Sequence, residues 1–227
     1  MVNDNDQEKE VAARASVKLV CEGDVVGLGT GSTAAYAVRF LGARVQAGLK
    51  IRGIPTSIHT GELAASLGIP LTTLDEVQEI DVTIDGADEV DPELRLIKGG
   101  GGALLREKIA ASATRKVVII ADSSKQVAVL GKFPVPVEVI KFAEALVAKK
   151  ITALGAAVKV RGEASGSPFV TDEGNHVLDC NFGRIPDPAA LASELESMAG
   201  VVEHGLFIGM AAVALIGKGD QVIELRR

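Results

Sequence analysis

The chain has very few aromatic residues and no cluster of basic ones. None of its 227 residues is tryptophan and only one is tyrosine, which disfavours an aromatic platform that stacks bases or sugars. The formal net charge is −6, and no run of lysine and arginine offers the electrostatic footprint of a nucleic-acid-binding protein. We therefore expect no nucleic-acid partner. An anionic ligand would have to be bound by local amide groups and a few placed cations.

Cysteine, long apolar runs and common hydrolase motifs are also scarce. Cys21 and Cys180 lack the close spacing of a metal site, so we expect two reduced thiols in a cytoplasmic protein. No run of about 18 apolar residues is present, so we expect no association with a membrane. The polar segment 1–10 does not resemble a signal peptide. The absence of GxSxG and HExxH motifs disfavours triad and zinc-hydrolase chemistry.

The first 130 residues alternate between strand-like and helix-like patterns. Apolar runs predict strands at 24–29, 51–56, 69–74, 82–85, 94–98 and 116–121. Helical spacing predicts helices at 6–21, 34–49, 59–67 and 103–113. This alternation predicts an α/β fold with a mostly parallel sheet that is covered on both faces.

A different pattern follows residue 130. Strands are predicted at 135–140, 156–161, 177–182 and 201–206, with helices at 142–154 and 188–198. The order β-α-β-β-α-β is that of a ferredoxin-like α+β unit. A hairpin at 213–216 and 222–225 is predicted to return to the first sheet. We therefore expect a larger domain of residues 1–130 and 207–227, and a smaller inserted domain of residues 131–206.

The glycine-rich segment GLGTGSTA, residues 27–34, follows a strand and opens a helix. Thr30, Ser32 and Thr33 place three hydroxyls beside the free amides of a helix N-terminus, which suits a phosphate monoester. A dinucleotide site would also need an acidic residue about 20 positions on, where the chain has Arg52 instead. The alternative is a tight turn whose Ser or Thr only caps the helix.

Four consecutive glycines, residues 99–102, follow Lys98. Such a run loses much conformational entropy on folding, but it lets several amides point at one anion. Together with Lys98 and the next helix N-terminus it predicts a site for a developing oxyanion. Glu107 lies in the second turn of that helix and can lean back toward the glycines as a base. The alternative is a solvated surface glutamate.

Asp85, Asp88 and Asp91 end or follow a predicted strand. They could form Asx-turns, hold Mg²⁺, or move protons on substrate hydroxyls, and their spacing does not separate these options. The segment DSSK, residues 122–125, follows another strand. Since ligands of such sheets bind beyond the carboxyl ends of the strands, we expect these segments to lie along one rim with the glycine-rich ones.

In sequence order, the motifs GLGTGSTA, DGADEVD, LIKGGGGALLREK, ADSSKQV, LGKFPVPVEV and VALIG resemble the A type of ribose-5-phosphate isomerase over nearly the whole chain. The resemblance implies a Rossmann-like domain with a ferredoxin-like lid. It implies interconversion of D-ribose 5-phosphate and D-ribulose 5-phosphate in the non-oxidative branch of the pentose phosphate pathway. It further implies an enediolate mechanism without metal or cofactor, and a homodimer, with a tetramer as the alternative.

The resemblance also implies roles for individual residues. Glu107 is the expected base that moves a proton between C2 and C1, Asp85 and Asp88 open the sugar ring, and Lys98 stabilises the enediolate. The expected substrate contacts are Thr30, Gly31, Ser32, Thr33, Gly86, Ala87, Gly99, Gly100, Gly101 and Lys125, and Lys9 is a further candidate. Two rival functions are another sugar-phosphate enzyme, such as an amino-sugar phosphate deaminase, and a non-catalytic sugar-phosphate sensor.

Overall fold

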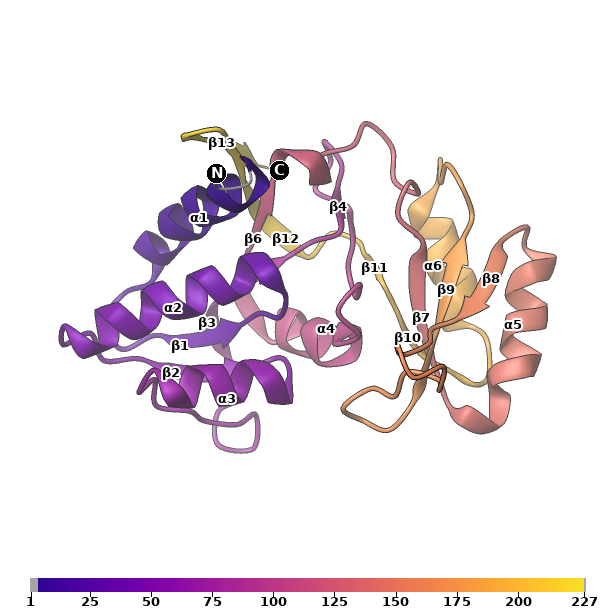
Figure 1. The fold of residues 1–227 in the computed structure, drawn as a ribbon, viewed down its shortest axis with the longest axis horizontal. Coiled ribbons are helices and arrows are strands. Elements are labelled where there is room, and N and C mark those ends of the chain that lie inside the picture. Colours follow the sequence, from indigo (N-terminus) through magenta and orange to yellow (C-terminus); the bar gives the residue numbers. More distant parts are fainter. Residues whose placement is uncertain (1–3, 227) are drawn as a thin grey trace.

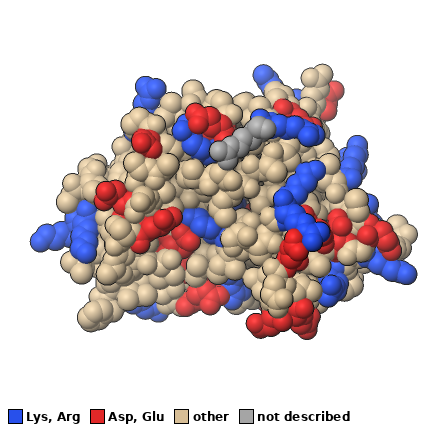
Figure 2. All heavy atoms as spheres, turned by 180° about the vertical axis from the view of Figure 1, so that it is seen from behind, with Lys and Arg blue, Asp and Glu red and all other residues tan. Residues whose placement is uncertain are grey.

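The structure, a computed structural model, describes residues 4–226 and contains two main β-sheets that lie side by side (Figure 1). The polar segment 1–10 is expected not to be a signal peptide, and its residues 1–3 lie outside the described residues. Among the residues described, no helix has the length and apolar character to cross a bilayer. On the face shown in Figure 2, acidic and basic side chains lie interspersed among uncharged ones, as expected from the composition.

The larger sheet has six strands in the order β13-β12-β6-β3-β1-β2. Its strands are β1 (Val25–Leu28), β2 (Arg52–Pro55), β3 (Ile80–Gly86), β6 (Thr114–Asp122), β12 (Ala211–Lys218) and β13 (Gln221–Arg226). All neighbours are parallel except β12 and β13, which confirms a mostly parallel sheet and the return of the C-terminal hairpin. The chain reverses its direction of travel across the sheet between β1 and β3, the position where doubly wound sheets bind ligands.

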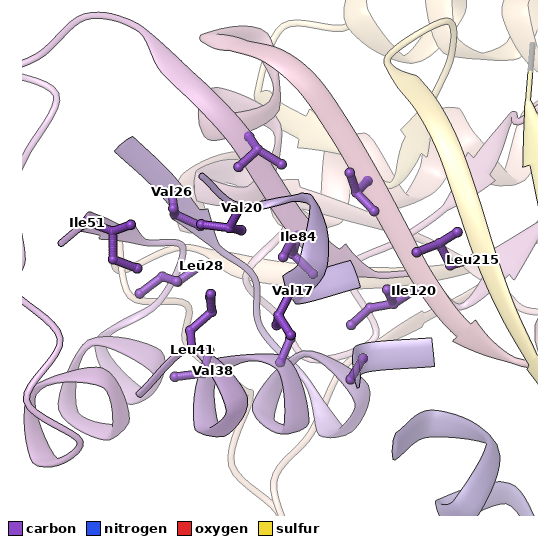
Figure 3. Close-up of a cluster of buried hydrophobic side chains, with 14 of the residues drawn as sticks. Val17, Val20, Val26, Leu28, Val38, Leu41, Ile51, Ile84, Ile120 and Leu215 are labelled. Carbon is purple, nitrogen blue, oxygen red and sulfur yellow. The ribbon is translucent and has the colours of Figure 1, made fainter. Parts of the chain in front are cut away.

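Helices cover both faces of this sheet (Figure 1). Helices α1 (Asp4–Ser16), α2 (Ser32–Gln46) and α3 (Ile58–Ser66) lie on one face and share one core, and α4 (Leu104–Ser112) packs on the other face. Because side chains alternate along a strand, every second residue points toward α1 and α2, as Val26, Leu28 and Ile84 do (Figure 3). Each such buried aliphatic side chain stabilises the fold by about 1.5–3 kcal/mol. This packing holds the carboxyl ends of the strands, and the loops beyond them, in place.

The prediction of a strand at residues 69–74 is wrong. This segment contributes one isolated bridge, between Leu71 and Gly53 of β2. Gly53 donates to the carbonyl of Pro70 and accepts from the amide of Thr72. Proline has no N–H to donate and is confined to sheet edges, so pairing does not extend further.

The strand predicted at 94–98 is shorter than expected and lies outside the parallel sheet. Leu94 has φ of 57°, in the left-handed region, so the extended conformation begins only after it. Strand β5 (Leu96–Ile97) pairs antiparallel with β4 (Glu89–Val90) and β11 (Leu206–Phe207) in a small third sheet. Lys98 follows this third sheet directly, so the glycine run reaches the rim from a sheet that the sequence did not predict.

The second large sheet contains β7 (Val135–Val139), β8 (Ala157–Val160), β9 (His176–Asn181) and β10 (Val201–His204). The order is β10-β7-β9-β8, and all neighbours are antiparallel. With α5 (Glu144–Ala153) and α6 (Pro188–Glu196) it forms the predicted ferredoxin-like arrangement around its own core. The domain limits at residues 130 and 206 stay a prediction. Three short 3₁₀ helices complete the fold: η1 (Val17–Leu19), η2 (Ser123–Lys125) and η3 (Lys141–Ala143).

Candidate active site

One cavity gathers the predicted site residues at the rim beyond β1 and β3. Its lining residues are Thr30, Gly31, Ser32, Thr33, Gly86, Ala87, Asp88, Lys98, Gly99, Gly100, Gly101, Glu107 and Lys125. Every substrate contact implied by the resemblance is in this set. Of the four expected catalytic residues only Asp85 is outside it, and Asp85 lies directly behind the wall, where Lys98 contacts it.

The loop between β1 and α2 is held from behind by buried hydroxyls. Gly31, with φ of 117°, precedes the helix, and the first amides of a helix have no intrahelical acceptor. The hydroxyl of Thr30 lies 2.8–3.1 Å from the hydroxyls of Thr56, Ser57 and Thr60. The side chain of Thr30 therefore anchors the loop, while the amides at the start of α2 stay available to an anion.

Asp85 joins this loop to the buried lysine. Its Oδ1 accepts hydrogen bonds from the amides of Thr30 at 3.1 Å and Gly86 at 2.7 Å, and its Oδ2 lies 2.9 Å from Lys98 Nζ. Gly29 is required for this approach, because a Cβ there would stand 2.2 Å from Asp85 Oδ1. Asp85 thus ties together three parts of the site.

Lys98 is a buried cation with fixed partners. Its Nζ donates to the carbonyl of Gly86 at 2.6 Å and lies 2.9 Å from Asp85 and 3.4 Å from Glu107 Oε2. Burial alone would lower the pKa of this amine, but the charges of Asp85 and Glu107 outweigh burial and raise it above its ordinary value. Lys98 therefore stays protonated.

Glu107 is the least satisfied polar group of the site. Its side chain is 5% exposed, and Oε2 has no hydrogen-bond partner within the part of the chain that the structure describes. The 3.4 Å approach of Lys98 is a charge contact without hydrogen-bond geometry. Burial raises the pKa of Glu107 to about 8, the charges of Asp85 and Asp88 add to the rise, and Lys98 opposes it. A carboxyl group with a pKa near neutrality suits a general base.

The glycine run fits closely around Asp88. The amide of Gly100 donates to Asp88 Oδ2 at 2.7 Å. A Cβ on Gly100 would stand 2.5 Å from Asp88 Oδ1, so no larger residue fits there without movement of the carboxylate. Gly99 and Gly102 have φ of 95° and 83°, conformations that other residues rarely adopt.

Two residues considered from the sequence lie elsewhere. Asp91 is fully buried and accepts hydrogen bonds from the amides of Glu93 and Arg95 and from the Arg95 side chain, so it shapes a turn. Lys9 pairs with Asp6 at 3.2 Å and does not line the cavity. Within residues 4–226 no group of three or more His, Cys, Asp and Glu side chains could hold a metal ion. Asp91 is held in its own turn, so the three aspartates do not come together as a set of Mg²⁺ ligands.

Comparison with known proteins supports the geometry. The family model of Ribose 5-phosphate isomerase A (phosphoriboisomerase A) matches residues 52–221. The chain belongs to the ribose 5-phosphate isomerase A family. A relative named Ribose-5-phosphate isomerase A from Parvibaculum lavamentivorans is 53% identical over 98% of this chain and 100% of its own length. Another, from Chloroflexus aurantiacus, is 54% identical over 94% of this chain and 91% of its own length.

Solved structures named as ribose 5-phosphate isomerases are also similar to this chain over nearly its whole length. One, in complex with phospho-erythronic acid, has a TM-score of 0.94 at 40% identity and covers 96% of this chain and 97% of that one. The ribose 5-phosphate isomerase A from Methanocaldococcus jannaschii has a TM-score of 0.92 at 43% identity, over 96% and 98% of the two chains.

Several residues that hold the site of this ribose 5-phosphate isomerase A family member were missed from the sequence. Glu8 of α1 accepts hydrogen bonds from Ser123 and Gly219, both at 2.9 Å, and so fixes the turn that carries Lys125. The Gly219 amide, more than any other group, holds the pKa of Glu8 below its ordinary value. The hydroxyls that hold Thr30 come from the segment TSIHT, residues 56–60, whose hydroxyl-rich composition could have indicated this role. Arg161 also contacts the glycine run, but no sequence pattern indicated it, because its partners are about 60 residues away in sequence.

Proposed function

We propose that this chain interconverts D-ribose 5-phosphate and D-ribulose 5-phosphate, with Glu107 as the base that moves the proton between C2 and C1. The observation that carries the proposal is a carboxylate oxygen of Glu107, which is buried at the cavity and has no hydrogen-bond partner among residues 4–226. A buried carboxylate oxygen left without a donor destabilises the fold. A base that takes a proton from the substrate would explain why this oxygen of Glu107 has no donor within the protein.

Lys98 and the glycine amides are the proposed stabilisers of the enediolate. Removing a proton next to a carbonyl places negative charge on the oxygens of C1 and C2, and that charge must be met as it forms. The Lys98 ammonium group has three donors: one bonds to the carbonyl of Gly86, and the carboxylate of Asp85 lies 2.9 Å from the nitrogen. The ammonium group therefore has a donor left for a substrate oxygen.

The two aspartates carry different proposed roles. Asp85 is occupied by two amides and Lys98, so we assign it to holding Lys98 and the phosphate loop. Asp88 lines the cavity and uses only Oδ2, toward Gly100. Its Oδ1 can accept and return a hydroxyl proton as the sugar ring opens, so Asp88 is the proposed ring-opening residue.

The phosphate group is proposed to bind at the other end of the cavity. The start of α2, at Ser32 and Thr33, offers amides and the positive end of the helix dipole. Lys125 lines the same cavity from η2 and adds a full positive charge. The phospho-erythronic acid bound by the similar structure is a sugar-acid phosphate of nearly the same size as the substrate, which supports a sugar phosphate as the ligand.

The proposal is tested by an isomerisation assay on purified protein. We expect conversion of ribose 5-phosphate to ribulose 5-phosphate that persists in excess EDTA, and solvent deuterium at C1 of the product. Binding of ribose 5-phosphate without turnover would instead indicate a sensor. Loss of activity in EDTA that Mg²⁺ restores would contradict the metal-free mechanism.

Assembly and location are further proposals. Large apolar side chains are exposed at Ile58, Leu71, Ile109, Phe142 and Leu146, and exposed apolar surface often marks contacts between subunits. This supports a homodimer, or a tetramer. The proposed location in the cytoplasm rests on the two free cysteines, Cys21 and Cys180. Light scattering on the purified protein measures the number of subunits, and a monomer at all concentrations would refute the assembly.

A further inference from the structure

Arg161 reaches from the antiparallel sheet to the glycine run. It follows strand β8 directly, and its Nη1 donates to the carbonyl of Gly99 at 2.9 Å and to that of Gly100 at 3.2 Å. Its side chain is 13% exposed. Arg161 does not line the cavity, so any effect on a bound ligand acts through the two glycines.

The guanidinium group is held in one orientation. Its Nε and Nη2 bond to the two oxygens of Asp179, a bidentate pair that fixes the plane of the group. Its Cζ lies 5.8 Å from the ring centre of Phe169. That ring in turn packs on the glycine run, since a Cβ on Gly102 would stand 2.4 Å from it. The positive charge of Arg161 therefore stays against the two carbonyls.

The carbonyls that Arg161 contacts belong to the same peptide groups as two amides of the glycine run. In a trans peptide the C=O and the following N–H point in opposite directions. The carbonyl of Gly99 shares its peptide with the amide of Gly100, and the carbonyl of Gly100 shares its peptide with the amide of Gly101. The Gly100 amide donates to Asp88. The Gly101 amide has no acceptor among residues 4–226, and Gly101 lines the cavity.

We propose that Arg161 is a positioning residue that orients and polarises the amides of Gly100 and Gly101 for the negative charge of the enediolate. A cation on a carbonyl draws electron density through the peptide and makes the attached N–H a stronger donor. The antiparallel sheet thus supplies a charge to the reaction without touching the substrate. This inference rests on the proposed isomerase function.

The competing explanation is that Arg161 only joins the two sheets mechanically. The two explanations differ in which ligands respond. A weakened charge site affects the transition state and any ligand that carries negative charge at that position. Phospho-erythronic acid is such a ligand, because its carboxylate stands in for the enediolate oxygens. Inorganic phosphate occupies only the phosphate end of the cavity and should not respond.

The test compares Arg161→Met and Arg161→Lys with wild type and with Arg184→Met, which changes an exposed arginine of the same sheet domain. The measurements are kcat and KM for ribose 5-phosphate, and inhibition by phospho-erythronic acid and by inorganic phosphate. Removing a direct oxyanion donor costs roughly 10²–10³ in turnover. For a residue that acts through the donors we expect kcat of Arg161→Met to fall about 10- to 100-fold.

Inhibition by phospho-erythronic acid should weaken by a similar factor, while KM and inhibition by phosphate stay within about threefold. Arg161→Lys keeps the charge and should recover part of kcat. An unchanged kcat, or equal weakening toward both inhibitors, overturns the inference. If Arg161→Met does not fold, the same comparison of the two inhibitors on Arg161→Lys decides. Inactivity of both wild type and Arg184→Met would overturn the proposed function itself, and this inference with it.

Discussion

Replacing Glu107 by glutamine should stabilise the protein while it removes the proposed base. The carboxyl group is buried, and its pKa in the fold is about 8 against an ordinary value of 4.5. The folded protein therefore retains a proton that the unfolded chain releases. Stability is fully present below about pH 4.5 and is lost progressively as the pH rises to about 8. Glutamine has the same shape and never ionises, so the variant does not show this loss.

The size of the gain follows from the two pKa values. A tenfold change in an acid constant corresponds to about 1.4 kcal/mol, so the full rise in pKa corresponds to about 5 kcal/mol. On this basis the variant should exceed wild type in free energy of unfolding by about 1 kcal/mol at pH 5, about 3 kcal/mol at pH 7 and about 5 kcal/mol at pH 9. A gain of about 3 kcal/mol corresponds to roughly 6–12 °C in Tm for a chain of this length.

Urea unfolding of both proteins at the three pH values measures this difference. Glu194→Gln makes the same chemical change at an exposed position of α6 and serves as the control. It should alter the free energy of unfolding by less than about 0.5 kcal/mol at each pH. A Glu107→Gln variant that is no more stable than wild type, or whose gain does not grow with pH, would refute the assignment of a buried carboxyl group with a raised pKa.

Further predictions concern the same cavity. In wild type, kcat/KM should rise about tenfold from pH 7 to a plateau above the pKa of about 8, since only the ionised Glu107 accepts a proton; a flat profile would contradict this. Lys98→Met should lower kcat by roughly 10²–10³ and move the rising limb to higher pH, because Lys98 lowers the pKa of Glu107. Gly100→Ala, which must displace Asp88, should lower kcat at least about tenfold, whereas Gly61→Ala, with no atom nearer than 3.4 Å, should not.

The site could be predicted largely because its chemistry is local in sequence. Lys98 and the four glycines connect β5 to α4, and Glu107 lies in that helix, so helix geometry alone brings the carboxylate back toward the glycines. The loop at residues 30–33 needed only the rule that ligands bind beyond the carboxyl ends of parallel strands. The cavity unites these segments as expected.

The missed features depend on long-range contacts or on a single residue. Arg161 meets Gly99 across 62 positions of sequence, and Glu8 meets Gly219 across 211, so no pattern within a window reveals them. The strand predicted at 69–74 was apolar enough to be extended, and Pro70 limited its pairing to one bridge. The separate roles proposed for Asp85 and Asp88 likewise rest on their hydrogen-bond partners, which the sequence does not show.

The most direct test of the account is turnover by Glu107→Gln alongside its affinity for phospho-erythronic acid. Ribose 5-phosphate isomerisation should fall by at least about 10³, because the base is gone, while phospho-erythronic acid should still bind within about tenfold of wild type. Turnover within tenfold of wild type in a folded variant would contradict the central claim that Glu107 moves the proton.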